Sequence, residues 1–199
     1  MLDIWNTKVE YVTQLDGTEI HYTVEAITNT QDGLRITADV QEPGLYSCGR
    51  IDTTNNFLFL YGYFECKAKI PKGQGFWSSF FVVAQAWPPE IDVFESLGLG
   101  NDTWLTVHKG VGDYSQMQRL ASVDLSEDYH VYGVLWEEDF VAWYIDGQRV
   151  YYNNDRVPQV PMFLYLMFSV GGWAGAPDET TVFPAHYDVE YVKVWQRTP

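Results

Sequence analysis

Short runs in which apolar and polar residues alternate recur along the whole chain. Alternation with a period of two is typical of strands that bury one face, and no stretch keeps the period of 3.6 that an amphipathic helix requires. We therefore expect an all-β protein, built as an antiparallel sandwich or barrel. The expected strands are Ile20–Ala26, Leu34–Val40, Gly49–Thr53, Tyr61–Ile70, Trp77–Ala84, Glu90–Ser96, Trp104–His108, His130–Glu137, Phe140–Ile145, Arg149–Tyr152, Met162–Phe168 and Tyr187–Trp195.

Turn residues separate these runs. The clearest turn is Asp146-Gly147, which stands between two apolar runs and supplies the positive φ angles that a tight primed hairpin turn demands. We find no linker, low-complexity tract or internal repeat, so the sequence predicts one domain over residues 1–199.

The run Pro88–Ser96 places three carboxylates within an otherwise apolar segment. In a regular strand Glu90 and Asp92 share one face, and Glu95 points to the other. One extra residue, a β-bulge at either of the two residues before Glu95, would return Glu95 to the side of the other acids. Acids on one face repel one another, but two-carboxylate glycoside hydrolysis needs such a pair. The alternative is a solvated strand face on which acids alternate with apolar residues.

Composition narrows the class of partner. The 199 residues suffice for one domain with a sizeable core, and 17% of them are aromatic, including 8 Trp and 14 Tyr. Such an excess fits a thick core, and it also fits a surface on which sugar rings lie against aromatic faces. The 27 acidic and 12 basic residues give a net charge of −15. This charge disfavours nucleic acid, anionic membranes and polyanionic polysaccharides, so a neutral substrate is expected.

The sequence contains few other functional features. It has no apolar run of about 18 residues, and Met1–Trp5 lacks the basic and apolar regions of a signal peptide. Cys48 and Cys66 could pair across neighbouring strands or remain buried free thiols. The four histidines lack metal-ligand spacing, and no nucleophile elbow or phosphate-binding glycine loop is present. We therefore expect no catalytic metal.

Several segments around the acidic run resemble the glycoside hydrolase family 16 enzymes, which are β-jelly-roll endo-glycanases with a retaining mechanism. The resemblance runs from about Ser47 to the end, whereas the earlier residues match weakly and the usual opening strand is absent or unusually short. The Glu-x-Asp-x-x-Glu spacing resembles the bulged branch, which holds laminarinase-like β-1,3-glucanases, agarases and carrageenases. The matching segments are Ser47–Ile51, Tyr61–Pro71, Gly75–Phe81, Glu90–Glu95, Phe168–Gly175, Phe183–Pro184 and Val189–Trp195.

The resemblance implies an antiparallel β-jelly-roll sandwich with a substrate cleft on its concave face, and a role for each acid. Glu90 would be the nucleophile, and Glu95 would be the general acid and then the general base. Asp92 would hold Glu90 through a hydrogen bond or a shared proton. Retention requires the two working carboxyls to lie roughly 5–5.5 Å apart. Both glutamate side chains would therefore lean inward over Asp92.

The resemblance also implies five substrate contacts, each with a structural alternative. Trp87 and Trp173 would lie against sugar rings, although tryptophans are more often core residues. Glu65 matches an acid that hydrogen-bonds sugar hydroxyls, but an outward-pointing strand acid would look the same. His108 would face the cleft, although a lone histidine is more often structural. Phe81 would either line the cleft or pack in the core.

The resulting expectation is an endo-acting retaining glycoside hydrolase that cleaves a β-1,3- or mixed β-1,3/1,4-glucan. Agarose, carrageenan and a succinoglycan-type exopolysaccharide are the alternative polymers, and a non-catalytic carbohydrate-binding jelly roll is the alternative class. We expect a secreted or extracytoplasmic monomer that requires no cofactor. Glu190 stands where relatives often carry an Asp at a structural calcium, so the resemblance implies at most a structural calcium, which the reaction would not require.

Overall fold

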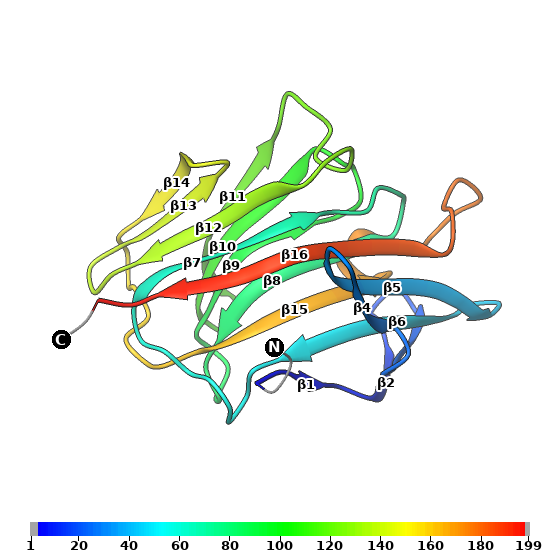
Figure 1. Cartoon of the computed structure of the whole chain (residues 1–199), viewed down its shortest axis with the longest axis horizontal. Helices are drawn as coiled ribbons and strands as arrows, with labels where there is room; N and C mark the ends of the chain where they lie inside the picture. The colour runs from blue at the N-terminus through cyan, green and yellow to red at the C-terminus, as the bar shows by residue number, and fades with distance from the viewer. Residues whose placement is uncertain (1–3, 198–199) are drawn as a thin grey trace.

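The computed structural model describes residues 4–197, which form strands, connecting loops and the short 3₁₀ turn η1 (Gly172–Ala174) (Figure 1). The strands are β1 (Asn6–Thr7), β2 (Glu10–Thr13), β3 (Glu19–Tyr22), β4 (Ile27–Thr30), β5 (Gly33–Glu42), β6 (Leu45–Asp52), β7 (Gly62–Lys69), β8 (Phe76–Val83), β9 (Glu90–Ser96), β10 (Asp102–Gly110), β11 (Asp113–Leu120), β12 (His130–Trp136), β13 (Val141–Ile145), β14 (Gln148–Asn153), β15 (Phe163–Val170) and β16 (Ala185–Trp195).

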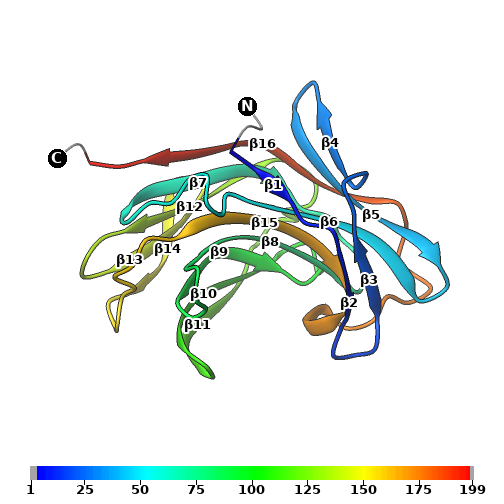
Figure 2. The same cartoon turned by 90° about the horizontal axis from the view of Figure 1, so that it is seen from below.

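These strands stack as two layers. The concave layer has the order β11-β10-β9-β8-β15-β6, and the back layer has the order β5-β16-β7-β12-β13-β14. Pairing of β5 with β6 joins the two layers. The strands pair antiparallel, except that β3 and β6 are parallel. In Figure 2 the layers lie one above the other, and β10 and β11 at one end and β2 and β3 at the other bend away from the back layer. The curvature of the sheet therefore makes the outer face of this layer concave, which confirms the expected antiparallel sandwich with a concave face.

Alternation along each strand divides its side chains between the core and an outer face. In β8, Phe80 and Val82 are buried between the layers, whereas Trp77 and Phe81 are partly exposed on the concave face. Burial of a large apolar side chain contributes about 1.5–3 kcal/mol, so this core dominates stability. Cys48 and Cys66 are both buried as free thiols, so they form no disulfide. The back layer's largest core side chains are Phe64, Tyr132, Trp136, Trp143 and Tyr187.

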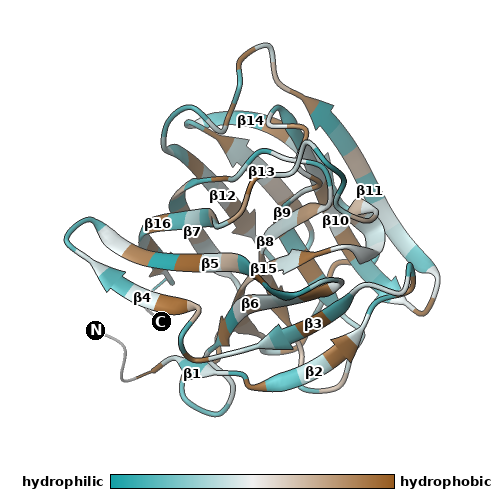
Figure 3. Ribbon diagram, turned by 90° about the vertical axis from the view of Figure 1, so that its right-hand side faces the viewer, coloured by the Kyte–Doolittle hydropathy of each residue, from teal (hydrophilic) through white to brown (hydrophobic). Residues whose placement is uncertain are grey.

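Every strand that alternation predicts is found, with bounds shifted by a few residues. The turn at Asp146-Gly147 is also confirmed, since both residues have positive φ, 50° and 75°. Alternation does not predict β1, β2, β4 or β11. The edge strand β11 is mostly polar, as its hydrophilic colours in Figure 3 show, and its residues are only partly buried or exposed. Within residues 4–197, no helical segment has the length and apolarity that crossing a membrane would require.

A β-bulge interrupts β9 at Val93. On β8, Phe80 and Phe81 stand opposite Phe94 and Asp92, so Val93 has no partner there, and the register with β10 shifts at the same place. The main-chain oxygen of Asp92 accepts a 2.7 Å hydrogen bond from Trp143 Nε1, which reaches across the core from β13. The bulge predicted from the acid spacing is confirmed, and the back layer holds it in place.

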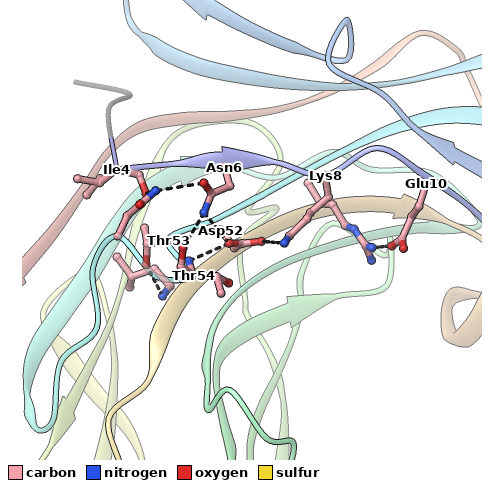
Figure 4. A network of polar contacts seen from close by, with 10 residues as sticks. Ile4, Asn6, Lys8, Glu10, Asp52, Thr53 and Thr54 are labelled. Carbon is pink, nitrogen blue, oxygen red and sulfur yellow. Dashed lines mark hydrogen bonds and ion pairs between the residues drawn. The ribbon is translucent and has the colours of Figure 1, made fainter.

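The N-terminal strands are fastened to β6 by a buried acid. Asp52 accepts hydrogen bonds from Asn6 and the Thr54 backbone and pairs with Lys8 at 3.1 Å (Figure 4). Burial raises the pKa of Asp52, but the bonds from Thr54 and Asn6 outweigh it, so the pKa is lowered. A buried carboxylate is tolerable when it is paired in this way. Next to it, Arg50 pairs with Glu10.

We predict that Trp143→Phe destabilises the protein, because the substitution leaves the buried Asp92 carbonyl without its donor. The expected loss is about 1–3 kcal/mol of unfolding free energy. Denaturant unfolding measures this loss, with Trp195→Phe as the control. Trp195 is 48% exposed, so that substitution should change stability by less than about 0.5 kcal/mol. Equal stability of wild type and Trp143→Phe would show that the bond does not hold the bulge.

Candidate active site

The bulge brings the three acids of β9 onto the concave face. Neighbouring strands show the shared side, because residues directly opposite each other across a sheet point to the same face. Glu90 stands opposite His108, and Glu95 stands opposite Trp104. Asp92 lies between the two glutamates along β9. Val93 and Phe94 both join the core on the other side. Three carboxylates thus gather where a regular strand would present only two.

Burial and mutual repulsion dominate the electrostatics of this cluster. Burial and the neighbouring Asp92 raise the pKa of Glu90 to about 9. Burial and Glu90 raise the pKa of Glu95 to about 8, and burial with Glu95 raises the pKa of Asp92 well above its ordinary value. The cluster therefore retains protons near neutral pH. Groups of this kind are suited to general acid catalysis.

His108 and Trp87 contact the Glu90 side of the cluster. His108 Nε2 lies 3.2 Å from Asp92 Oδ2 and 3.7 Å from Glu90 Oε1. Burial lowers the pKa of His108, although the charge of Glu90 opposes the effect. The ring of Trp87 lies 6.1 Å from that of His108, and Trp87 is 49% exposed. A hydrogen bond from Trp87 and the charge of His108 both favour the ionised form of Glu90.

Three tryptophans surround the Glu95 end. Trp77 Nε1 donates a 3.0 Å hydrogen bond to Glu95 Oε1. Trp173 packs edge-on against Trp77 with ring centroids 6.2 Å apart, and it lies 5.0 Å from Trp104. Trp173 is 42% exposed, so a face of the group is open to a ligand.

Phe81 lies on the concave face, where its ring stacks on that of Tyr165 at 4.7 Å with an interplanar angle of 7°. Of the two alternatives for Phe81, the structure favours the cleft-lining one. Beyond this pair, Tyr22 donates to Ser169 at 2.8 Å and carries the guanidinium of Arg50 over its ring. Alternation could have placed Tyr165 and Trp104 on this face, but neither belongs to a motif, so sequence reasoning missed them.

Glu65 is the one predicted contact that the structure does not bring to the cluster. It lies on β7 in the back layer, on the outer face opposite the core side chains Phe64 and Cys66. Its carboxylate accepts hydrogen bonds from Tyr63 at 2.9 Å and Tyr191 at 3.0 Å. The expectation that Glu65 faces the cleft is wrong. An outward strand acid, the alternative weighed for it, describes its position.

Two sets of residues are considered as possible metal ligands. Ligand atoms of Glu90, Asp92 and His108 all lie within 4.8 Å of one another, but their contacts with each other and with Trp87 already account for the grouping. The calcium expectation concerned Glu190, which pairs with Lys67 at 2.6 Å. A side-chain cation therefore already engages the carboxylate that calcium would need. The residues fit a calcium ion poorly, and its presence stays a prediction.

A separate cavity of about 930 Å³ opens between the layers beside β16. It lies where β5 stops pairing with β16 at Val189, and aliphatic side chains such as Ile51, Leu166 and Val192 line it. Asp32, Tyr129, Glu190 and Tyr191 are its only titratable lining residues. The cavity holds no cluster of acids or bases, so the concave face remains the candidate active site.

We predict that Glu95→Gln stabilises the folded protein, and does so more strongly as pH rises. The pKa of Glu95 is raised on folding from an ordinary 4.5 to about 8, so folding becomes less favourable as pH increases through that interval. A neutral glutamine removes this penalty and the repulsion. The expected gain is about 1–3 kcal/mol at about pH 8 and little at about pH 4. Thermal unfolding at both pH values measures it, and a gain independent of pH would contradict the assignment.

Comparison with known proteins identifies relatives of the chain. The family model described as "Glycosyl hydrolases family 16" matches residues 14–193. An endo-1,3-1,4-beta-glycanase of Rhizobium meliloti (strain 1021) is 34% identical over 156 residues, which cover 75% of this chain and 33% of that protein. A beta-glucanase of Acetivibrio thermocellus is 32% identical over 184 residues, covering 85% of this chain and 52% of that protein. The chain thus spans about a third to a half of the length of these relatives.

Solved structures agree with the sequence comparison. The catalytic domain of an endo-1,3-beta-glucanase (laminarinase) from Thermotoga petrophila RKU-1 superposes with a TM-score of 0.87 at 30% identity, covering 98% of this chain and 92% of that one. The laminarinase catalytic domain from Thermotoga maritima MSB8 gives 0.86 at 29% identity, with the same coverage. These neighbours also bear out the expected jelly roll. On the strength of the family match, this chain belongs to the glycosyl hydrolases of family 16.

Proposed function

We propose that this chain is an endo-acting retaining glycoside hydrolase that cleaves internal β-linkages of a β-1,3- or mixed β-1,3/1,4-glucan. The observation that carries the proposal is the bulge at Val93, which gathers Glu90, Asp92 and Glu95 on one buried patch of the concave face. Three partly protonated carboxylates destabilise a fold, so their arrangement is explained by chemistry rather than by packing.

In the first step Glu90 would act as the carboxylate that attacks the anomeric carbon. Its contacts with Trp87 and His108 favour its charged form, whereas burial and Asp92 raise its pKa. The attack therefore requires Glu90 to give up its proton first, and Asp92, which is more deeply buried, would then hold the ionised Glu90 in place through their hydrogen bond. The bond from Glu90 to the sugar forms as the glycosidic bond breaks. Glu95 gives its proton to the departing oxygen, so no charge is left on the leaving chain.

In the second step Glu95, now ionised, would take a proton from water. The resulting hydroxyl attacks the same carbon, the bond to Glu90 breaks, and Glu95 is again protonated. Two inversions at one carbon retain its configuration. The raised pKa of Glu95 supports both halves of this cycle, because a group that holds its proton near neutral pH can give it up and recover it.

A neutral glucan fits the face better than a charged polymer. The net charge of −15 would repel carrageenan, whereas Trp87, Trp173 and Phe81 offer apolar faces to sugar rings. The names of the relatives, beta-glucanase and endo-1,3-1,4-beta-glycanase, point to the same class of substrate. All three acids come from one strand, so a single copy contains the reacting groups. We infer that the chain acts outside the cytoplasm, where polymeric glucans are found.

The first test is release of reducing ends from laminarin, barley mixed-linkage glucan, agarose and a succinoglycan-type polymer. We expect oligosaccharides from one of the glucans, and a loss of at least about 10⁴-fold in Glu90→Ala. The matched control is Glu65→Ala, an acid of the back layer that should leave the rate unchanged. Binding without release from any polymer, in wild type and variant alike, would instead support a carbohydrate-binding protein.

The pH profile of kcat/KM on the preferred glucan gives a second prediction. The raised pKa values, about 8 for Glu95 and about 9 for Glu90, predict a bell-shaped profile that is highest between them. Activity should fall at higher pH, because Glu95 loses the proton that the first step requires, and at lower pH, because Glu90 becomes protonated and cannot attack. A rate that keeps rising through about pH 9 would contradict Glu95 as the acid.

A further inference from the structure

The indole of Trp77 makes the one side-chain hydrogen bond to Glu95 found among the described residues. Trp77 lies on β8, next to β9, and its Nε1 donates to Glu95 Oε1 at 3.0 Å. The bond crosses diagonally between the strands, since the residue opposite Glu95 is Ser79. The donor therefore comes from the neighbouring strand of the same sheet, which carries none of the three acids.

This contact leaves the two oxygens of Glu95 in different situations. A carboxylic acid has one carbonyl oxygen, which accepts, and one hydroxyl, which donates. An N–H directed at Oε1 makes Oε1 the acceptor and leaves the proton to Oε2. The proton that would be transferred is thereby assigned to Oε2 and points in a fixed direction.

We propose that Trp77 is a positioning residue that fixes the orientation of the Glu95 carboxyl for proton transfer, an inference that rests on the function proposed above. A tryptophan that only packed in the sheet or offered its ring face to a sugar would need no bond to the acid. The indole bond also favours the ionised form of Glu95 and thus limits how far burial raises its pKa. Loss of the bond should therefore alter both the rate and its pH dependence.

The indole itself is held by its neighbours. Trp173 packs edge-on against Trp77, with an interplanar angle of 82°, and Trp104 lies behind Trp173. Trp104 belongs to the same group, but its Nε1 is buried without an acceptor among the described residues. Trp104 therefore serves as a matched control, an indole of the same cluster whose N–H makes no bond to the acid.

The charged surroundings of Glu95 are few, so a shift in its titration can be assigned. On β9 the titratable neighbours are Glu90 and Asp92, and on β10 they are His108 and Asp102, whose carboxylate accepts hydrogen bonds from Ser96, Leu97 and Leu99. The side chains that β8 presents to this face, Trp77, Ser79 and Phe81, carry no charge, and Trp173 of η1 is also neutral. No lysine or arginine comes from the strands directly paired with β9 to this end of the face, since Lys109 of β10 pairs with Asp155.

The test compares wild type with Trp77→Phe and Trp104→Phe on two substrates. One is the preferred glucan, whose alkoxide leaving group needs a proton. The other is a dinitrophenyl β-glycoside of a short glucan oligosaccharide, whose leaving group departs without one. We expect Trp77→Phe to lower kcat on the glucan by about 10- to 100-fold, with KM changed less than about threefold. The pre-steady-state burst of dinitrophenolate should change less than about threefold, and the alkaline limb of the pH profile should move upward.

Trp104→Phe should leave the alkaline limb where it is in wild type. If Trp77→Phe fails to fold, benzothienylalanine at position 77 keeps the ring shape and lacks the N–H, so it tests the bond alone. Equal losses on both substrates, or an unmoved alkaline limb, would overturn the positioning role. If wild type itself gives neither glucan products nor a burst, the proposed function fails instead, and the two failures are thereby distinguished.

Discussion

The extra residue at Val93 is the constraint on which the site depends. Without it, Glu95 would lie between the layers beside Val93, and Phe94 would turn to the concave face, so a buried acid without a partner would replace an apolar core side chain. With it, the acid reaches the concave face and the core keeps both apolar residues. The bond from Trp143 to the Asp92 carbonyl ties this irregularity to the back layer. The second layer is therefore part of what positions the acids, although it carries none of them.

The same constraint explains why the protein needs a large core. Three buried carboxylates that raise one another's pKa reduce folding stability at neutral pH. The contacts of these acids offset only part of this cost, because they are neutral indoles and a histidine whose pKa is lowered. Stabilisation must come from the apolar residues between the layers, where Phe80, Trp136 and Trp143 are fully buried. The site is accommodated because the sandwich is thick and aromatic.

Local patterns predicted much of this molecule, and the errors have a shared physical origin. Alternation located every strand that has a clear buried face, and the spacing of the acids on β9 predicted the bulge. Alternation also showed that Glu65 points outward, but a sandwich has two outer faces, and only the strand order tells which one a residue occupies. Strand β11 was not predicted for a related reason: an edge strand buries too little surface to need an apolar face, so it shows no alternation. The bond between Trp77 and Glu95 joins different strands across a diagonal, so no sequence spacing could reveal it.

The choice of donors around β9 follows from what an acid catalyst requires. An arginine or lysine beside Glu95 would orient it strongly but would also lower its pKa, so that the proton would be gone at neutral pH. An indole N–H supplies direction with a partial charge only, and therefore disturbs the proton affinity less. Trp77 supplies such an N–H to the carboxyl of Glu95. Trp143 likewise supplies an uncharged N–H, to the main-chain carbonyl of Asp92 at the bulge. The abundance of tryptophan near β9 is thus explained by orientation without charge as well as by contact with sugars.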